Sequence, residues 1–344
     1  MRFILILILL PFSIFSQEKD SLKIKVSGFL ETYYAYDFSN PTTDTKLPFM
    51  YNYNRHNEFN VNNGLIRAQL QYGNTYASIA VHAGTYVDDN YASEDIKLVS
   101  EAYVGMYLND NKKSSIEVGI MPSYIGFESA TTATNLTLTR SILAENSPYF
   151  MTGIKYNYKP SDKWSFSGLV TNGWQRINRP DKTVTPALGT QIIYKPSEKA
   201  TLNWITFIGK EFYGTELAMR YFSNLYWDNT WNSKWRTILG FDFGIQDSSS
   251  MNDEHLFWMS PVFIAQYSIN PKWQTAVRVE YYQDEDNVIV ATSDAFKTSG
   301  ASINFDYLLN SKVKLRTEAR YFDSKEAIFF DNKSNNFFVT TSLS

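Results

Sequence analysis

The stretch that decides the fold is Lys312–Asp323, KVKLRTEARYFD. Every second position from Val313 to Tyr321 is apolar or small, and the positions between them are charged: Lys314, Arg316, Glu318 and Arg320. Successive side chains of a β-strand point to opposite faces, so this spacing predicts a strand with one apolar and one charged face. Such a strand suits a wall that separates lipid from water.

Segments of about ten residues with the same alternation recur along the chain, and helical periodicity is nearly absent. Trp273–Tyr282 and Lys234–Gln246 are further clear examples. The pattern predicts about sixteen strands. They are expected at residues 23–36, 58–72, 75–87, 96–108, 115–122, 149–159, 163–174, 186–195, 200–212, 216–227, 234–246, 256–269, 272–283, 297–308, 312–323 and 336–344.

The connections between these segments fall into two classes of length. One class is tight and polar, as at Gly73–Asn74 and Asn270–Lys272, and the other is long, as at Asp37–Asn57 and Ser123–Pro148. Outer-membrane barrels have short periplasmic turns and long extracellular loops. The sequence therefore predicts an all-β fold, an antiparallel transmembrane β-barrel of about 16 strands that forms one domain over residues 17–344.

Composition and the N-terminus favour export to the outer membrane. Residues 1–16 combine an early Arg2 with an apolar run and predict a signal peptide cleaved near Ser16–Gln17. Aromatic residues make up 16% of the chain, which suits aromatic girdles at both membrane interfaces. An aromatic-rich β-sandwich that binds carbohydrate is the alternative, and the strand number and alternating loop lengths argue against it. Cysteine is absent, which excludes disulfides and thiolate metal sites.

A barrel of sixteen strands is wide enough to enclose a water-filled lumen, which predicts a porin for passive diffusion of small solutes or ions. Ser123–Pro148 is the third long loop, and in sixteen-stranded general porins the third external loop folds inward and narrows the channel. We therefore expect Glu128, Arg140 and Glu145 to shape a constriction. The alternative is a solvated loop over the mouth of the barrel.

The inward strand faces carry charges of both signs. The predicted pore-lining residues are Arg67, Glu101, Glu117, Lys155, Arg220, Arg236, Asp242, Arg278, Glu280, Arg316, Glu318 and Arg320. Charged rings bias a pore toward counter-ions, so a basic wall would give a weak anion preference. Charges that pair with one another and merely hydrate the lumen are the equal alternative.

Catalysis is not expected, and neither a cofactor nor a metal site is predicted. His82 lies near serines, but no nucleophile motif accompanies it. The expected partners are outer-membrane lipid and lipopolysaccharide, small solutes or ions, and a second and third copy if the barrel forms a homotrimer; nucleic acid is not expected. A non-conducting barrel that anchors external loops for adhesion or complex assembly is the main alternative function, and a lipid hydrolase is a weaker one.

One region carries a family resemblance. It comprises MPSYIGFESA at 121–130, TRS at 139–141, AENSPY at 144–149, TGIKY at 152–156 and NGWQR at 172–176. This ordered set resembles the OmpL-like β-barrel porin family (BBP2-type) of Bacteroidetes. The resemblance implies an outer-membrane pore without catalytic residues, and it names no solute. The chain ends in Ser344 rather than an aromatic residue, so either the assembly signal is atypical or terminal residues are missing.

Overall fold

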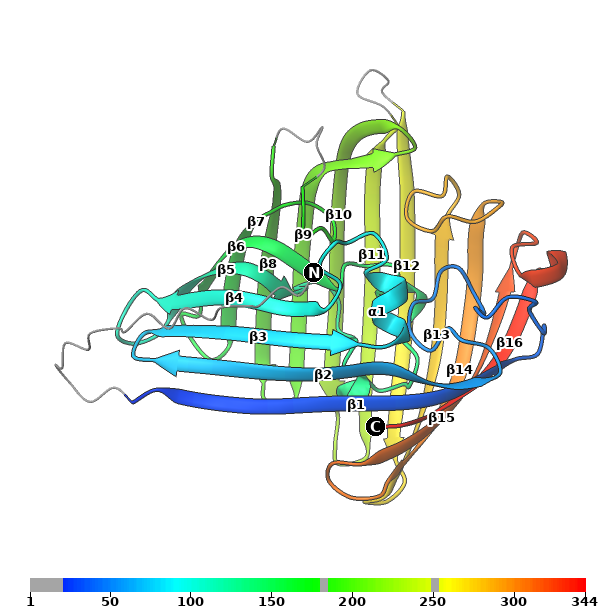
Figure 1. Ribbon diagram of the computed structural model, residues 1–344, viewed down its shortest axis with the longest axis horizontal. Coiled ribbons are helices and arrows are strands. Elements are labelled where there is room, and N and C mark those ends of the chain that lie inside the picture. Colours follow the sequence, from blue (N-terminus) through cyan, green and yellow to red (C-terminus); the bar gives the residue numbers. More distant parts are fainter. Residues whose placement is uncertain (1–20, 180–184, 249–253) are drawn as a thin grey trace, which may run out of the picture.

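The computed structural model describes residues 21–179, 185–248 and 254–344, which form a closed antiparallel barrel (Figure 1). The predicted signal peptide lies outside the described residues. Sixteen strands follow one another around the barrel in chain order. They are β1 (Lys23–Asp37), β2 (Glu58–Tyr72), β3 (Thr75–Ala83), β4 (Val99–Tyr107), β5 (Ser114–Pro122), β6 (Phe150–Tyr158), β7 (Trp164–Thr171), β8 (Ala187–Ser197), β9 (Ala200–Tyr213), β10 (Glu216–Thr230), β11 (Trp235–Asp247), β12 (His255–Ser268), β13 (Trp273–Asp284), β14 (Phe296–Leu308), β15 (Lys314–Ser324) and β16 (Asn335–Leu343).

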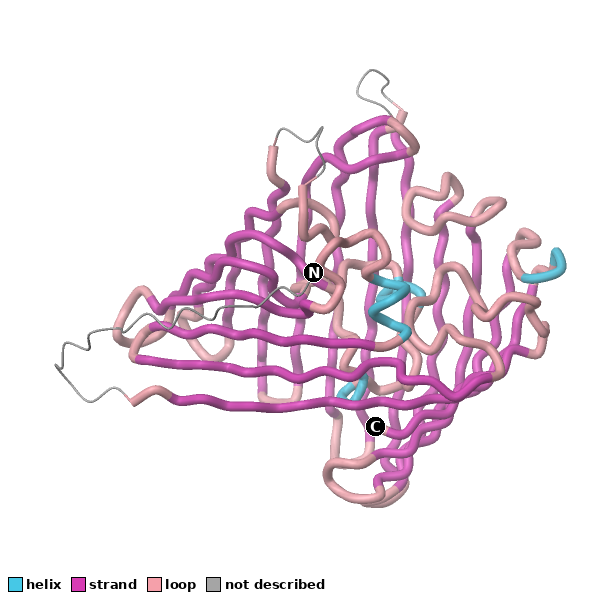
Figure 2. The backbone as a smooth tube through the Cα atoms, viewed as in Figure 1, coloured by secondary structure: helices cyan, strands magenta, loops and turns pink. Residues whose placement is uncertain are grey.

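Helix is confined to short pieces within the loops (Figure 2). These pieces are α1 (Thr85–Asn90), α2 (Ile142–Glu145) and the 3-10 turns η1 (Thr132–Thr134) and η2 (Phe330–Asn332). Within residues 21–179, 185–248 and 254–344, no helix has the length and apolar character needed to cross a membrane.

Closure is made by β1, which pairs with β2 on one side and β16 on the other. Ala35 lies opposite Glu58 of β2 and Thr340 of β16, and both pairings are antiparallel. A closed ladder leaves no strand edge with unpaired backbone groups, which is the condition for a sheet to sit in lipid. The predicted sixteen-strand barrel is confirmed.

Two strands end earlier than predicted, each near a glycine. β3 stops at Ala83 because Gly84 adopts φ 137°, and a Cβ there would lie 2.5 Å from the carbonyl oxygen of Asn62. The chain then turns into α1 instead of continuing the strand. β7 stops at Thr171, two residues before Gly173 with φ 138°.

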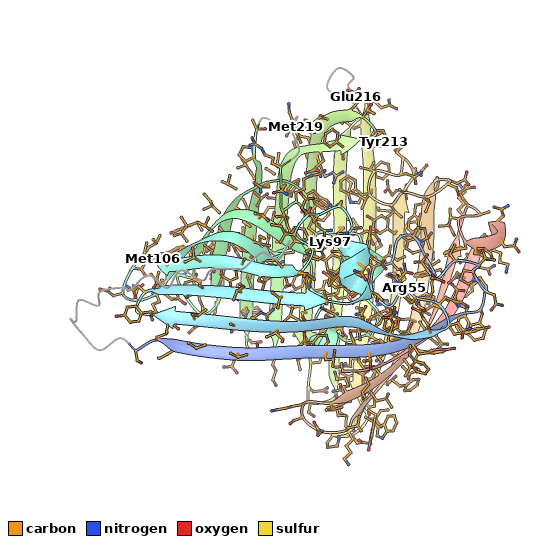
Figure 3. All side chains as sticks on the ribbon, viewed as in Figure 1. Arg55, Lys97, Met106, Tyr213, Glu216 and Met219 are labelled. Carbon is orange, nitrogen blue, oxygen red and sulfur yellow. The ribbon has the colours of Figure 1, made fainter. Side chains whose placement is uncertain are left out.

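Side chains project from both faces of the wall (Figure 3). The outer face is apolar, as shown by Ile66, Leu239 and Val279, which are more than half exposed. Aromatic pairs ring the end of the barrel that carries the tight turns, which we call the short-turn end. Their ring centroids lie 4.4 to 4.7 Å apart: Trp164–Tyr194, Trp235–Tyr267 and Trp273–Tyr307. This arrangement is typical of a girdle at a membrane interface.

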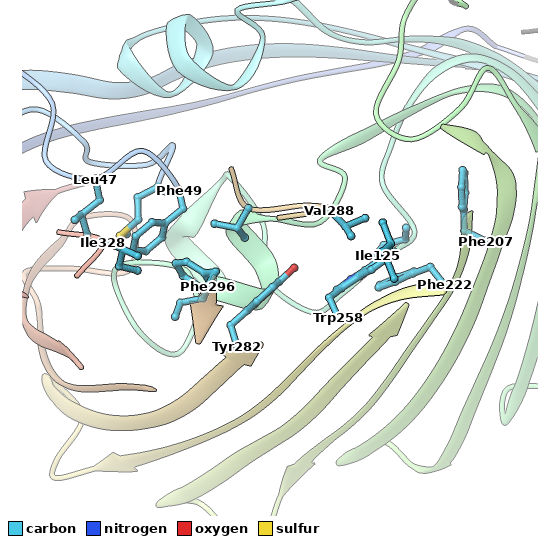
Figure 4. Close-up of a cluster of buried hydrophobic side chains, with 14 of the residues drawn as sticks. Leu47, Phe49, Ile125, Phe207, Phe222, Trp258, Tyr282, Val288, Phe296 and Ile328 are labelled. Atoms are coloured by element: carbon cyan, nitrogen blue, oxygen red, sulfur yellow. The ribbon is translucent and has the colours of Figure 1, made fainter. Parts of the chain in front are cut away.

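The opposite end, which we call the long-loop end, is filled from inside. An apolar cluster lies within the curve of the strands rather than outside it (Figure 4). Wall residues such as Trp258 and Phe296 meet loop residues such as Phe49 and Ile125, and all are at most 5% exposed. The barrel therefore has a packed interior in this half, which positions the loops described next.

Candidate functional site

The third loop, residues 123–149 between β5 and β6, folds into the barrel. Its backbone and side chains contact inward-facing residues of the wall from β11 to β15 and of β1. The short helix α2 within it begins at Ser141, whose Oγ accepts a hydrogen bond from the N–H of Ala144 at 3.2 Å. The loop therefore lies against one side of the lumen.

Three wall arginines hold the backbone of the third loop by donating to its carbonyl groups. The Arg278 Nη1 donates to the carbonyl of Thr139 at 2.6 Å. The Arg316 Nη1 donates to the carbonyl of Thr132 at 3.0 Å, and the Arg320 Nη1 to that of Arg140 at 2.7 Å. Arginine suits this role because its planar fork offers several donors in fixed directions.

Wall carboxylates complete the clamp by accepting the N–H and hydroxyl groups of the third loop. Glu318 accepts from the N–H of Thr139 at 2.6 Å, and Glu280 from that of Ile142 at 2.7 Å. Asp242 accepts from the hydroxyl of Ser147 at 3.0 Å. Glu318 and Glu280 also pair with Arg278 and Arg320, so these wall charges compensate one another and anchor the loop.

The three residues predicted to shape the constriction are buried within the third loop. Glu128 accepts from the N–H of Ser141 at 2.9 Å, and burial raises the pKa of its carboxyl. The Arg140 guanidinium lies 3.8 Å from the centre of the Tyr149 ring. Glu145 accepts from the N–H of Tyr51 at 2.8 Å and from the Tyr149 hydroxyl at 2.9 Å.

The predicted pore-lining residues divide into a covered and an accessible set. The covered set is at most 6% exposed: Glu101, Arg220, Asp242, Arg278, Glu280, Arg316, Glu318 and Arg320. Loops or neighbouring wall side chains cover these residues, and Glu101 and Arg220 border the two cavities described below, so their role in lining a pore stays a prediction. The accessible set keeps partial contact with solvent: Arg67, Glu117, Lys155 and Arg236.

The accessible charges do not form a basic wall. Arg67 pairs with Glu101, and Arg236 pairs with Asp228 at 2.7 Å. Among the described wall residues, the arginines of β13 and β15 are likewise paired, as in Arg316–Asp306 at 2.8 Å. The structure thus favours the alternative in which charges of opposite sign pair with one another.

Sequence reasoning missed the first loop, residues 38–57, which also enters the barrel. Leu47, Phe49 and Met50 are at most 2% exposed and join the apolar cluster. Lys46 lies 4.2 Å from the centre of the Phe338 ring, and burial lowers its pKa to about 7. The available signal was the apolar run from Leu47 to Met50, which is unusual for a solvated loop.

Two cavities inside the barrel are formed by residues that the structure describes. The wall cavity, about 300 Å³, lies beside β2 to β4 and is lined by Arg67, Glu101 and Tyr149, among others. The loop cavity, about 430 Å³, lies among the loops and is lined by Glu145, Trp174 and others.

Consecutive residues of the third loop line different cavities. Glu145, Asn146 and Ser147 face the loop cavity, and Pro148 and Tyr149 face the wall cavity. Residues 145–149 therefore form a partition between the two cavities at this point, and we use that name for this segment below. The Tyr149 N–H donates to the Gln175 side chain at 2.7 Å, which ties the partition to the loop after β7.

Solved structures share this fold at low sequence identity. The outer membrane channel DcaP of Acinetobacter baumannii is 13% identical, with a TM-score of 0.64 over 93% of this chain and 96% of that one. An anion-selective porin from Comamonas acidovorans is 10% identical, with a TM-score of 0.63 over 94% and 99%. OmpF of Salmonella typhi is 12% identical, with a TM-score of 0.60 over 94% and 97%. At these identities the likeness shows the fold alone.

No curated protein matches the chain. A family model described as "Putative beta-barrel porin-2, OmpL-like" matches residues 23–344, which is nearly the whole chain and the entire barrel. The match agrees with the closed sixteen-strand wall, its apolar outer face and its inward-folded third loop. The chain is an integral β-barrel of the outer membrane, and it belongs to the OmpL-like β-barrel porin family.

Proposed function

We propose that this barrel is a narrow diffusion channel for small polar solutes or ions. The observation that carries the proposal is the pair of cavities to which adjacent residues of the third loop, Ser147 and Pro148, contribute. The loop cavity would open toward the exterior, since long loops of outer-membrane barrels are extracellular. The wall cavity would lead along β2 to β8 toward the periplasm.

The inner face of β2 to β8 supports this route because it is polar and only partly covered. Glu117 accepts from the Tyr76 hydroxyl at 2.8 Å, and Lys155 lies opposite Glu117 in the β5–β6 pairing. Both charged residues keep intermediate exposure. Charges of opposite sign that face each other on a solvent-exposed wall give a channel little selectivity between anions and cations, so small solutes of either sign could pass.

The partition sets the size limit in this proposal. Tyr149 is held by its hydroxyl to Glu145 and by a hydrogen bond of 2.9 Å from the Asn52 side chain. The Arg140 guanidinium packs on its ring. A solute must pass beside this group, so the channel is narrower than a barrel of this width would allow with an empty lumen.

A barrel that anchors loops without conducting is the second candidate. It is favoured by one observation, the apolar cluster that fills the long-loop end of the lumen. A lipid hydrolase has less support, because His82 is 3% exposed and its Nε2 contacts the carbonyl of Lys97 at 3.1 Å. The centre of its ring lies 4.8 Å from the centre of the Tyr91 ring, in an edge-to-face contact.

Single-channel recording of the refolded protein in a planar bilayer tests the proposal. We expect stable current steps, smaller than those of a barrel of equal width without inward-folded loops. Heat-modifiable gel mobility verifies folding in the same preparation. A silent bilayer with a folded barrel would reject the channel and favour the anchoring alternative.

A further inference from the structure

Arg220 is a buried cation that lacks a carboxylate partner. It lies on the inner face of β10, is 5% exposed, and is the one strand residue that lines the loop cavity in the described part of the chain. Among the residues that the structure describes, no carboxylate forms an ion pair with it. A buried charge without a counter-ion is costly, so such a group is a candidate for binding an external charge.

The guanidinium is held in a fixed orientation. Its Nε donates to the Gln246 side chain at 2.8 Å, and the Gln246 side chain donates in turn to the carbonyl of Glu211 at 3.1 Å. The carbon of the guanidinium lies 5.2 Å from the centre of the Trp174 ring. Nη1 and Nη2 donate to no described residue, so the outer edge of the fork remains free.

The neighbouring acids form their hydrogen bonds and ion pairs with groups other than Arg220. Glu211 pairs with Arg176 at 2.9 Å and accepts from the N–H of Trp174 at 2.6 Å. Asp284 accepts from three successive N–H groups, of residues 288 to 290, at 2.7 to 2.9 Å. Glu145 accepts from groups of the first loop and from Tyr149.

We propose that the loop cavity binds a small organic monocarboxylate, whose two oxygens pair with the free fork of Arg220. Arginine pairs bidentately with a carboxylate because the two planar groups match in geometry. The Trp174 indole, at the edge of the same cavity, would contact the apolar part of the ligand.

A single negative charge fits the cavity better than a multivalent one. Arg176 pairs with Glu211, so Arg220 is the guanidinium of this lining that has no ion-pair partner among the described residues. Glu145 lines the same cavity and would repel further negative charge. The inference rests on the proposed function in one respect, that the loop cavity is the outer part of the solute's route.

Isothermal titration of the refolded, detergent-solubilised protein tests the inference, with sodium benzoate as the probe. Benzamide is the neutral control of equal shape, and inorganic phosphate is the multivalent control. We expect benzoate to bind at least about tenfold more tightly than either, since a charge-assisted pair contributes more than about 1.4 kcal/mol. Arg220→Gln should weaken benzoate binding by a similar factor.

Arg236→Gln is the matched control, because Arg236 is also an inward-facing wall arginine and lies outside the loop cavity. It should leave benzoate binding unchanged. The comparison with benzamide needs no variant, so it remains decisive if Arg220→Gln does not fold.

The inference is overturned if the wild-type protein does not bind benzoate, if benzamide or phosphate binds equally well, or if a folded Arg220→Gln variant retains full affinity. Bilayer recording separates this result from the proposed function. A conducting barrel without benzoate binding rejects the carboxylate site alone, and a silent barrel that binds benzoate rejects the channel alone.

Discussion

Replacing Arg278 by methionine should release the third loop from the barrel wall. The Arg278 guanidinium donates to the carbonyl oxygen of Thr139 at 2.6 Å and to the Thr139 hydroxyl at 2.9 Å. It also forms an ion pair with Glu318 at 2.7 Å. Removing one partner of a buried ion pair costs about 3–5 kcal/mol. We take the lower end because Arg316 and Arg320 still hold the loop. The released fraction should then rise about 100-fold.

Trypsin cleavage after Arg140 measures this fraction. Arg140 is 3% exposed in the docked loop, so the protease reaches it only when the loop is released. When release is fast relative to cleavage, the cleavage rate follows the released population. We expect the Arg278→Met variant to be cut at this position about 100 times faster than wild type, and to show noisier single-channel currents.

Arg236→Met provides the control for this experiment. Arg236 also forms an ion pair on the inner wall, but its side chain is 39% exposed and its hydrogen bonds to described residues go to Asp228. An exposed pair contributes at most about 1 kcal/mol, so cleavage at Arg140 should change less than about fivefold. A folded Arg278→Met barrel that is cut as slowly as wild type would refute the idea that buried wall charges anchor the loop.

Three further predictions address the partition and the other loops. Tyr149→Ala should join the two cavities and raise single-channel conductance several-fold; an unchanged conductance would place the narrowest point elsewhere. Asp284→Asn replaces one of the two carboxylate oxygens that together accept from three N–H groups, so amide exchange within residues 288–290 should accelerate about tenfold by mass spectrometry. Lys46 has a pKa of about 7 in the docked first loop against an ordinary 10.5, so docking should strengthen as pH rises from about 7 to 10.5 and weaken as it falls through that window. Exchange of the Leu47 amide, corrected for its intrinsic rate, should show this dependence in wild type and lose it in Lys46→Met.

The strand pattern allowed most of the wall to be predicted. Alternation at Lys312–Asp323 gave the correct inner and outer faces, because Leu315 and Tyr321 face outward while Arg316 and Arg320 are buried inside. This succeeded because each membrane strand must place apolar residues toward lipid, a constraint that acts within about ten residues of chain. The errors at β3 and β7 lie near Gly84 and Gly173, whose left-handed conformations a period-two pattern does not reveal.

The interior could be predicted only in part. The inward direction of the third loop followed from its order among the loops, and the charged faces of β13 and β15 were evident from spacing. The sequence did not reveal which charged side chains stay exposed to solvent. Their exposure depends on contacts with residues more than 100 positions away, as between Arg316 and Thr132.

The sequence by itself determined a closed sixteen-strand wall, an apolar exterior and a charged interior, because these depend on local periodicity and on the lipid around the chain. Tertiary structure alone decided that the first loop enters the barrel and that residues 145–149 border both the wall cavity and the loop cavity. It also left Arg220 without an ion-pair partner among the described residues, whereas Arg316 and Arg320 pair with Asp306 and Glu280. The physical reason is that two charged side chains from separate strands compensate each other only when folding brings them into contact.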